Sequence, residues 1–342
     1  MRILVTGGAG YVGSISIERL LAAGHEVVVV DDLTTGHRSA ADGARLVEGS
    51  YVDKPTLVAL LERERIEALL HCAARSLVPE SIVDPARYYR DNVTGGVALL
   101  EAVRTVGIRR VVFSSTAAVY GMPTVTPIPE DAALAPINPY GETKRTFEAG
   151  LRWYGSAYGL RSVALRYFNV AGASDYNGES HDPETHLIPN VLAAAETGRP
   201  VTVFGTDYPT PDGTAVRDYI HVLDLADAHL AALEATDPMD PRTSDPEDPA
   251  DVTRGRAVAL NLGSAAGFSV REVLSAAERV VGRPIPATPG PRRPGDPPIL
   301  VAANERAREV LGWTPRRGSL DEMIGSAWAW RQRHPAGYRQ ES

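Results

Sequence analysis

The chain has little cysteine, no long apolar run and no excess of positive charge. Its single cysteine, Cys72, excludes an internal disulfide and a metal site built from several thiolates. No stretch is long enough to span a bilayer, and we expect no secretory leader, because the segment "RILVTGGAG" lacks the apolar region and cleavage site of one. A net charge of −8 gives no attraction to nucleic acid or an anionic membrane. We therefore expect a cytoplasmic protein that acts on a small molecule, with no metal, nucleic-acid or membrane partner.

Short β-rich runs alternate with helical stretches in the first half of the chain. "RILVT", "HEVVVVDD", "ARLVEG", "EALLHCAA", "RRVVFSST" and "RSVALRYFN" read as strands, and several are apolar on both faces. This alternation predicts an α/β fold with a doubly wound parallel Rossmann sheet over residues 1–169, which binds ligands at the carboxyl ends of its strands. Turn-rich stretches follow and predict a smaller C-terminal α/β lobe over 170–342, with some segments returning to the main sheet. Residues 237–256, rich in Asp-Pro, read as an exposed insert.

A glycine-rich turn follows the first predicted strand and opens a helix. Gly8, Gly10 and Gly13 have the spacing of the dinucleotide-binding fingerprint, and Gly7, Gly10 and Gly13 have a three-residue spacing as well. Glycine leaves room for a pyrophosphate to approach the backbone amides at the helix N-terminus. The pattern predicts a dinucleotide site.

Two acidic residues, Asp31 and Asp32, end the second predicted strand, 18 residues after Gly13 in the case of Asp31. A carboxylate there accepts hydrogen bonds from the adenosine ribose hydroxyls, and the pair would repel a 2′-phosphate. NAD is therefore favoured over NADP.

A tyrosine and a lysine stand four residues apart in "NPYGETKRTFE". Tyr140 and Lys144 would lie on one face of a helix, where an ammonium favours phenolate and lowers the pKa of tyrosine towards that of a usable base. The strand "RRVVFSST" ends in three hydroxyl residues, the last of which is Thr116. In a doubly wound sheet that strand end lies near the nicotinamide, so the three side chains are expected to converge on one substrate hydroxyl.

Several motifs occur together along nearly the whole chain: "TGGAGYVGS", "FSSTAAVYG", "NPYGETK", "LRYFNVAGA", "FGTDYPTPDGTAVRDYIHVLDLADAH", "LNLGS" and "RRPGD". With them the sequence resembles the extended short-chain dehydrogenase/reductase superfamily and, within it, the UDP-glucose 4-epimerases. The resemblance implies bound NAD and epimerisation at C4 of a nucleotide sugar through a transient 4-keto intermediate, most closely with UDP-galactose and UDP-glucose.

The resemblance also implies roles for residues. Tyr140 removes the proton of the sugar 4-hydroxyl, Lys144 lowers the tyrosine pKa and contacts the nicotinamide ribose, and Thr116 hydrogen-bonds the reacting oxygen. The positions that match cofactor contacts of the family are Gly7, Gly10, Tyr11, Val12, Gly13, Asp31, Asp32, Leu33, Ser50, Tyr51, Cys72, Ala73, Ala74, Ser76, Asn92, Tyr140, Lys144 and Phe168. Those that match substrate contacts are Thr116, Asn169, His186, Leu187, Phe204, Arg217, Tyr219, Arg293, Asp296 and Leu300. The family further implies a homodimer, formed by helices at about 85–106 and 140–158.

Some positions depart from the family pattern. Ser50 replaces a usual aspartate near adenine, Ser76 a frequent lysine near the cofactor, and His186 a common asparagine beside the substrate. Leu300 stands where a bulky tyrosine restricts the family to glucose and galactose, so 2-acetamido sugars are expected to be admitted too.

Other reactions stay open at this level. A 4-epimerase that prefers a UDP-N-acetylhexosamine or a dTDP-sugar is one alternative, and a net dehydrogenase with exchangeable NAD is another. A 4,6-dehydratase is disfavoured because Ala117 and Ala118, rather than an Asp-Glu pair, follow Thr116. A dinucleotide sensor without catalysis is disfavoured because both Tyr140 and Lys144 are present.

Overall fold

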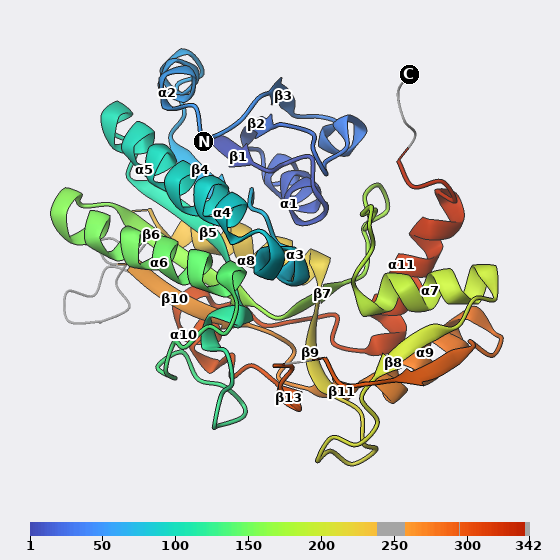
Figure 1. Cartoon of the computed structure of the whole chain (residues 1–342). Helices are drawn as coiled ribbons and strands as arrows, with labels where there is room; N and C mark the ends of the chain where they lie inside the picture. The colour runs from blue at the N-terminus through green and yellow to red at the C-terminus, as the bar shows by residue number, and fades with distance from the viewer. Residues whose placement is uncertain (238–256, 294, 339–342) are drawn as a thin grey trace.

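The computed structural model describes residues 1–237, 257–293 and 295–338. Its main layer is a seven-stranded sheet (Figure 1). The strands are β1 (Arg2–Thr6), β2 (Glu26–Asp31), β3 (Arg45–Glu48), β4 (Ala68–His71), β5 (Arg110–Thr116), β6 (Arg161–Tyr167) and β10 (Ala257–Leu262). All are paired in parallel, in the order β10-β6-β5-β4-β1-β2-β3. The predicted doubly wound parallel sheet is confirmed.

Helices cover both faces of this sheet, as the doubly apolar strands require (Figure 1). On one face lie α1 (Tyr11–Ala22), α8 (Val222–Ala235) and α10 (Glu305–Leu311), and on the other α2 (Lys54–Arg63), α5 (Gly95–Val106) and α6 (Pro139–Tyr158). The neighbours Leu4 and Val5 of β1 are fully buried in opposite cores. Each such side chain contributes roughly 1.5–3 kcal/mol on burial.

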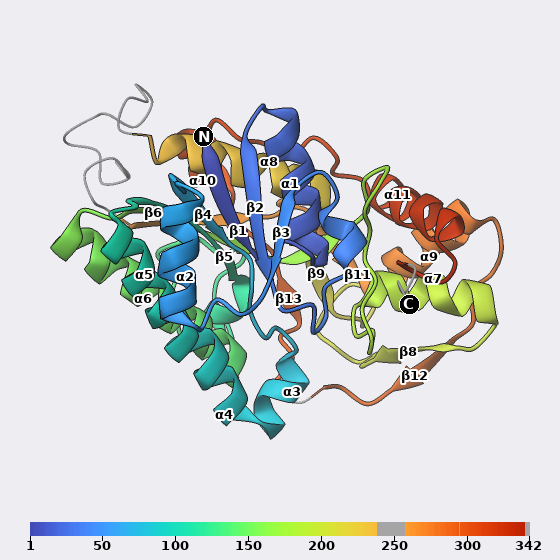
Figure 2. The same ribbon diagram turned by 90° about the horizontal axis from the view of Figure 1, so that it is seen from above.

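A second, smaller lobe is built mainly from the later part of the chain. One of its sheets contains β7 (Asn169–Ala171), β9 (Val216–His221), β11 (Gly267–Ser269) and β13 (Ile299–Leu300), and the other contains β8 (Val201–Phe204) and β12 (Ala287–Gly290). Its helices are α7 (Leu187–Thr197), α9 (Val270–Val281) and α11 (Leu320–Arg333). Figure 2 shows these helices grouped on the side of the molecule away from α2 and α5, around a core of their own.

The chain passes from one lobe to the other at the carboxyl end of β6. The run predicted as one strand over 161–169 is two strands, because the backbone leaves the main sheet at Phe168 and β7 then pairs with β9. The side-chain amide nitrogen of Asn169, Nδ2, donates a hydrogen bond to the Asp218 carbonyl, 3.0 Å away. The second lobe is therefore attached at the edge of the sheet where ligands are expected.

Shorter elements complete the described chain. They are α3 (Val78–Val83), α4 (Pro85–Tyr88), two 3₁₀ segments, η1 (Arg38–Ala41) and η3 (Ala117–Tyr120), and the π-helical segment η2 (Tyr89–Thr94). Residues 238–256, nearly all of the predicted insert, lie outside the described residues. None of the described helices is both long and apolar enough to cross a membrane.

Candidate active site

The glycine turn lies where the strand order of the main sheet reverses, between β1 and β4. Gly7 has φ +70°, and a Cβ there would lie 2.6 Å from the Ala73 backbone. A Cβ on Gly13 would lie 2.1 Å from the Gly7 carbonyl oxygen, so both positions need glycine for packing. Gly10 differs, because a Cβ there would lie 3.5 Å from its nearest neighbour, the Gly7 carbonyl oxygen, which is an ordinary van der Waals contact. The described protein atoms therefore leave room for a ligand beside Gly10.

That space adjoins the N-terminus of α1. Gly10 is the N-cap residue and makes no side-chain cap, so the first helical N–H groups face the space without a capping oxygen. A helix N-terminus of this kind binds the oxygens of a phosphate. The local structure thus fits the pyrophosphate of a dinucleotide.

The two acids at the end of β2 play different structural parts. Asp31 is buried, and its carboxylate accepts hydrogen bonds from the N–H groups of Ala9 and Leu33, each at 2.9 Å. Burial raises the pKa of Asp31, while these two hydrogen bonds lower it. Asp32 is exposed and accepts from the Thr34 N–H at 3.0 Å. Asp31 therefore fixes the glycine turn and keeps acceptor capacity for a ribose.

Other predicted cofactor residues follow β3 and β4. Ser50 and Ser76 are exposed. The Tyr51 hydroxyl donates to the Asp91 carbonyl at 2.7 Å, so this group is already engaged. Asn92 is buried, and its amide group accepts from the Arg75 N–H at 2.8 Å and donates to the Arg75 carbonyl at 3.0 Å. This tyrosine and asparagine thus hold the backbone beside the turn.

The remaining predicted cofactor positions lie around the same strand ends. Cys72 to Ala74 continue the chain directly after β4, and burial raises the pKa of the Cys72 thiol to about 11. Tyr11 and Val12 open α1, and the hydroxyl of Tyr11 donates to the Gly172 carbonyl at 2.6 Å.

Helix α6 begins at Pro139, directly after a residue that caps it. Asn138 is its N-cap, with the side-chain oxygen accepting from the Gly141 N–H at 2.8 Å, and Pro139 occupies the first helical position. A Cβ on Gly141 would lie 2.5 Å from the Ala118 carbonyl oxygen, so only glycine lets the helix approach the loop after β5 this closely. This contact sets Tyr140 beside the end of β5.

Thr116, Tyr140 and Lys144 meet at that end of β5, all three of them buried. Burial raises the pKa of Tyr140 to about 12, and a hydrogen bond with the Thr116 side chain acts in the opposite direction. The Lys144 ammonium donates to the Ser114 carbonyl at 2.8 Å and lies over the Tyr140 ring, 5.8 Å from its centroid. Burial also lowers the pKa of Lys144 to about 8. The expected net lowering of the tyrosine pKa is not what this structure shows, because burial outweighs the other influences.

A buried ion pair behind the lysine was missed at the sequence level. Arg166 and Glu148 lie 2.6 Å apart, and the same carboxylate accepts a hydrogen bond of 2.5 Å from Ser115. Glu148 also raises the pKa of Lys144, against the effect of burial. Its spacing of four residues from Lys144 was the available signal, since this spacing puts both on one helix face.

The predicted nucleotide-side residues are gathered in the second lobe. Arg217 and Asp296 form an ion pair at 2.5 Å, so a residue expected to bind pyrophosphate is paired with one expected to bind ribose. The Arg293 guanidinium lies over the Phe204 ring, 4.2 Å from its centroid. Leu300 is opposite Arg217 in the pairing of β13 with β9.

Three further residues predicted to contact the substrate lie in different surroundings. Tyr219 is buried in β9 with a raised pKa, which burial causes. Leu187 begins α7. His186 occupies the N-cap position without a side-chain cap; its imidazole is half exposed, and Nδ1 lies 2.7 Å from Glu179.

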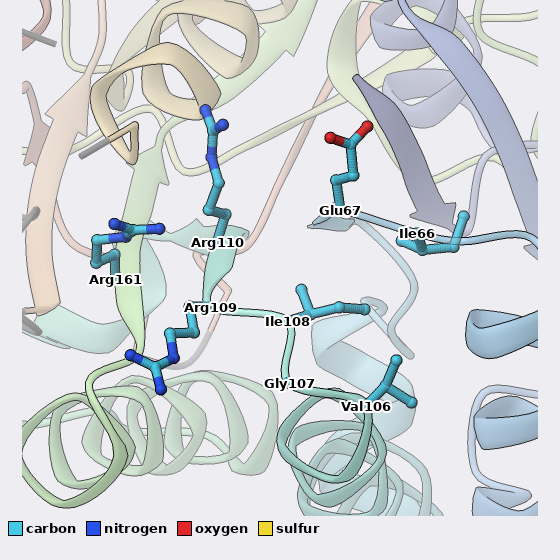
Figure 3. A pocket seen from close by; sticks show the side chains of 8 residues that line it. All are labelled: Ile66, Glu67, Val106, Gly107, Ile108, Arg109, Arg110 and Arg161. Atoms are coloured by element: carbon cyan, nitrogen blue, oxygen red, sulfur yellow. The ribbon is translucent and has the colours of Figure 1, made fainter. Parts of the chain in front are cut away.

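A cavity of about 240 Å³ lies elsewhere, at the amino ends of β4, β5 and β6 (Figure 3). Its lining is Ile66, Glu67, Val106, Gly107, Ile108, Arg109, Arg110 and Arg161. The described residues around it include none of the predicted site residues, so this cavity is separate from the candidate active site.

Comparison with known proteins identifies the family of this chain. Residues 3–244 match the model of the NAD dependent epimerase/dehydratase family. The chain belongs to this family. It is 48% identical to the UDP-glucose 4-epimerase of Lacticaseibacillus casei over 342 residues, which cover 99% of each chain.

Solved structures agree with this membership. UDP-glucose 4-epimerase from Brucella ovis in complex with NAD is 44% identical, with a TM-score of 0.89 over 96% of this chain and 98% of that one. The enzyme from Stenotrophomonas maltophila, with bound NAD and formylated UDP-arabinopyranose, is 37% identical, with the same TM-score over 98% and 99%. NAD is thus the cofactor of the family, and the space beside Gly10 and the acids after β2 fit it.

Proposed function

We infer that the protein interconverts UDP-glucose and UDP-galactose by NAD-dependent epimerisation at C4 of the sugar. The observation that carries this inference is the buried group of Thr116, Tyr140 and Lys144 beside the glycine turn. Full-length likeness to UDP-glucose 4-epimerases supports it. Bound NAD supplies the acceptor and donor for the C4 hydride, so the reaction has no net redox change.

Residues of the chain itself transfer the proton of the sugar 4-hydroxyl. We assign Tyr140 as the group that takes the 4-hydroxyl proton and later returns it, because its hydroxyl lies at the strand end and is hydrogen-bonded to Thr116. Thr116 holds the reacting oxygen in place. Lys144 offers a fixed positive charge beside the ring, which favours phenolate when the proton leaves. A tyrosine with a raised pKa is a weak base until such positive charge compensates for burial.

The second lobe holds the nucleotide while the sugar turns. We assign Arg217 and Arg293 to the pyrophosphate and Asp296 to a ribose diol, since guanidinium groups match paired phosphate oxygens. The present pairing of Arg217 with Asp296 at 2.5 Å would then be exchanged for contacts to substrate. Residues 1–169 are proposed as the main NAD-binding domain and 170–342 as mainly the nucleotide-sugar lobe.

A 4-epimerase of wider sugar range is the second candidate, and the packing of Leu300 favours it. This side chain contacts the cluster of Val119, Tyr120 and Ile128 just beyond Thr116, so it lies between the second lobe and the reacting end of β5. Leucine cannot hydrogen-bond and is smaller than tyrosine. Admission of UDP-N-acetylglucosamine alongside UDP-glucose follows from that extra room.

The reaction can be tested by incubating purified protein with UDP-galactose and no added NAD, then separating the products. UDP-glucose is expected without stoichiometric release of NADH. A 4-keto-6-deoxy sugar, or NADH equal to the substrate consumed, would overturn the proposal.

Tyr140→Phe tests the assigned base with little change of shape. Turnover should fall about 10²–10⁴-fold, because a positioned acid–base group contributes that much, while UDP-sugar binding persists. Tyr176→Phe is the matched control, since this tyrosine lies outside the candidate active site and is 76% exposed. Turnover at the wild-type level in Tyr140→Phe would exclude the assignment.

We also propose a cytoplasmic homodimer paired through α5 and α6. Both helices expose large apolar side chains, with Val97 50%, Trp153 68% and Tyr158 51% exposed. Exposed apolar side chains on two helices that pack together fit a surface that a second copy covers. Sedimentation at micromolar concentration should give a dimer, and Trp153→Arg should shift it towards monomer. A monomeric wild type would contradict the proposal.

A further inference from the structure

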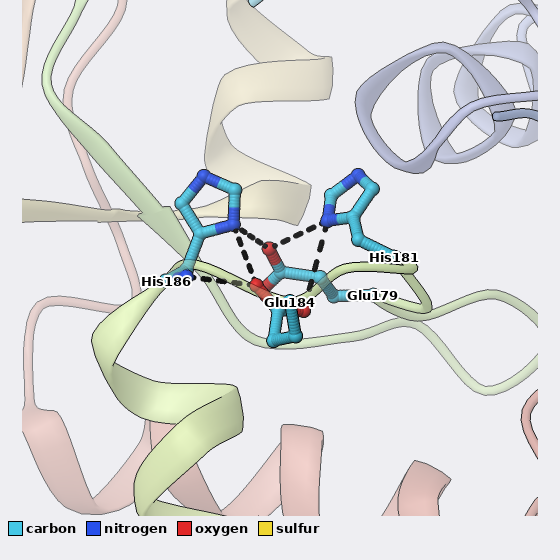
Figure 4. A group of neighbouring side chains, drawn as sticks. All are labelled: Glu179, His181, Glu184 and His186. Atoms are coloured by element: carbon cyan, nitrogen blue, oxygen red, sulfur yellow. Dashed lines mark hydrogen bonds and ion pairs between the residues drawn. The ribbon is translucent and has the colours of Figure 1, made fainter. Parts of the chain in front are cut away.

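Four potential metal ligands converge in the loop between β7 and α7. Glu179, His181, Glu184 and His186 each offer one ligand atom, and these four atoms lie within 4.8 Å of one another. Figure 4 shows both carboxylates between the two imidazoles, with Nδ1 of each ring facing inward. None of the catalytic roles assigned above uses Glu179, His181 or Glu184.

Both imidazole nitrogens lie close to both carboxylates. His181 Nδ1 lies 3.2 Å from Glu179 and 3.7 Å from Glu184. His186 Nδ1 lies 2.7 Å from Glu179 and 3.0 Å from Glu184. A tetrahedral Zn²⁺ with bonds of about 2.0–2.1 Å separates neighbouring ligand atoms by about 3.3 Å. The two distances to Glu184 end on its two different oxygens, and the four candidate ligand atoms lie within 4.8 Å of one another, so side-chain rotation has to draw them together around an ion.

His181 gives a second indication. Its Nδ1 atom is buried from solvent and makes no hydrogen bond of acceptable geometry, although a carboxylate oxygen is 3.2 Å away. A buried ring nitrogen without an aligned partner is costly. A cation placed between this nitrogen and the carboxylates would satisfy it.

Charge and ligand type select the class of cation. With neutral imidazoles the four residues carry a charge of −2, which a divalent ion balances. Imidazole nitrogen favours zinc and related transition metals, whereas Mg²⁺ and Ca²⁺ prefer oxygen ligands throughout. The only cysteine, Cys72, adjoins β4 and does not belong to the cluster. Zinc is thus the matching ion.

We propose that this cluster binds one Zn²⁺ per chain through two imidazole nitrogens and two carboxylates. The ion would brace the loop against the first lobe. That loop already contacts the first lobe, since His37 Nε2 donates to the Ser180 carbonyl at 2.9 Å and the Tyr11 and His181 rings pack edge to face. The proposal does not rest on the proposed reaction, although His186 also matches a substrate contact of the family, and it differs from the sequence-based expectation of no metal.

Protons compete with the metal for these nitrogens. Zinc must therefore displace protons, and binding should release them into the buffer. A network held by protons alone is the competing description of the cluster.

The test uses full-length, untagged protein treated with a chelator and titrated with ZnCl₂ by calorimetry in two buffers of different ionisation enthalpy. We expect one Zn²⁺ per chain in the micromolar range or tighter, with proton release and no comparable binding of MgCl₂. X-ray absorption of the zinc-loaded protein should show two imidazole ligands. Binding only at millimolar zinc, or a site without histidine, would overturn the proposal.

Variants separate this cluster from chance surface binding. Glu184→Gln and His181→Gln should each weaken zinc binding at least tenfold, whereas His25→Gln, outside the cluster, should leave it unchanged. Circular dichroism checks that each variant is folded. The X-ray absorption spectrum of the zinc-loaded wild type tests the ligands independently, even if a variant fails to fold. Equal zinc affinity in wild type and Glu184→Gln would refute the assignment.

Discussion

Replacing Gly10 by alanine separates the needs of the cofactor from the needs of the fold. Gly10 has φ −86° and ψ 172°, which alanine adopts without strain, and the new Cβ would meet only the Gly7 oxygen, at 3.5 Å. The fold should therefore keep its stability to within about 1 kcal/mol, because the restriction of the unfolded chain by alanine and its poorer fit at an N-cap act in opposite directions. The methyl group, however, occupies the space assigned to the pyrophosphate.

The expected loss falls on NAD binding. Hydrogen bonds to a charged group contribute about 1.5–3 kcal/mol each, so the loss of one should weaken NAD binding about 10–100-fold. Calorimetry on protein stripped of nucleotide measures this affinity, and urea unfolding without NAD measures stability. Normal NAD affinity in a folded Gly10→Ala protein would refute the reasoning.

Two other glycines serve as controls for the same substitution. Gly13→Ala should lose stability as well as NAD binding, because its Cβ would lie 2.1 Å from a carbonyl oxygen. Forced overpacking of this kind costs about 1–3 kcal/mol or more. Gly325→Ala, in α11 with nothing within 4 Å of the new Cβ, should leave NAD affinity unchanged.

Three further perturbations test the site and its surroundings. Lys144→Ala should move the activity profile to higher pH, because the phenolate loses a cation that lies over its ring; an unchanged profile would argue against that role. His229 is fully buried, and burial lowers its pKa to about 3, so the folded protein keeps it neutral while the unfolded chain takes up a proton near pH 6.5. Stability from this group therefore falls on acidification, and in His229→Gln the change in unfolding free energy between pH 7.5 and 5.5 should be smaller by about 1.4 kcal/mol; an equal change by urea unfolding would contradict this. Leu300→Tyr should selectively remove activity on UDP-N-acetylglucosamine, and equal losses on UDP-glucose and the acetamido sugar would show that Leu300 only packs.

Local patterns in the sequence were enough to predict much of this protein. The apolar runs identified the strands of the main sheet up to β6, because a parallel strand covered on both faces has to be apolar throughout. The spacing of Tyr140 and Lys144 predicted a helix there, and the structure adds that Asn138 caps it and Pro139 opens it. The glycine turn and the acids at the end of β2 could be predicted because each pattern involves residues close together in the sequence.

Tertiary structure decided what depends on residues far apart in the chain. The sequence could not show that Gly7 and Gly13 are required by packing while Gly10 leaves space, because that difference depends on how the turn folds against itself and the loop after β4. Nor could it give the direction of the tyrosine pKa. The Tyr140–Lys144 spacing predicted a lowered value, but burial is a property of the assembled core and raises it to about 12. The spacing put the two side chains on one face, whereas the surrounding core set the balance between desolvation and charge.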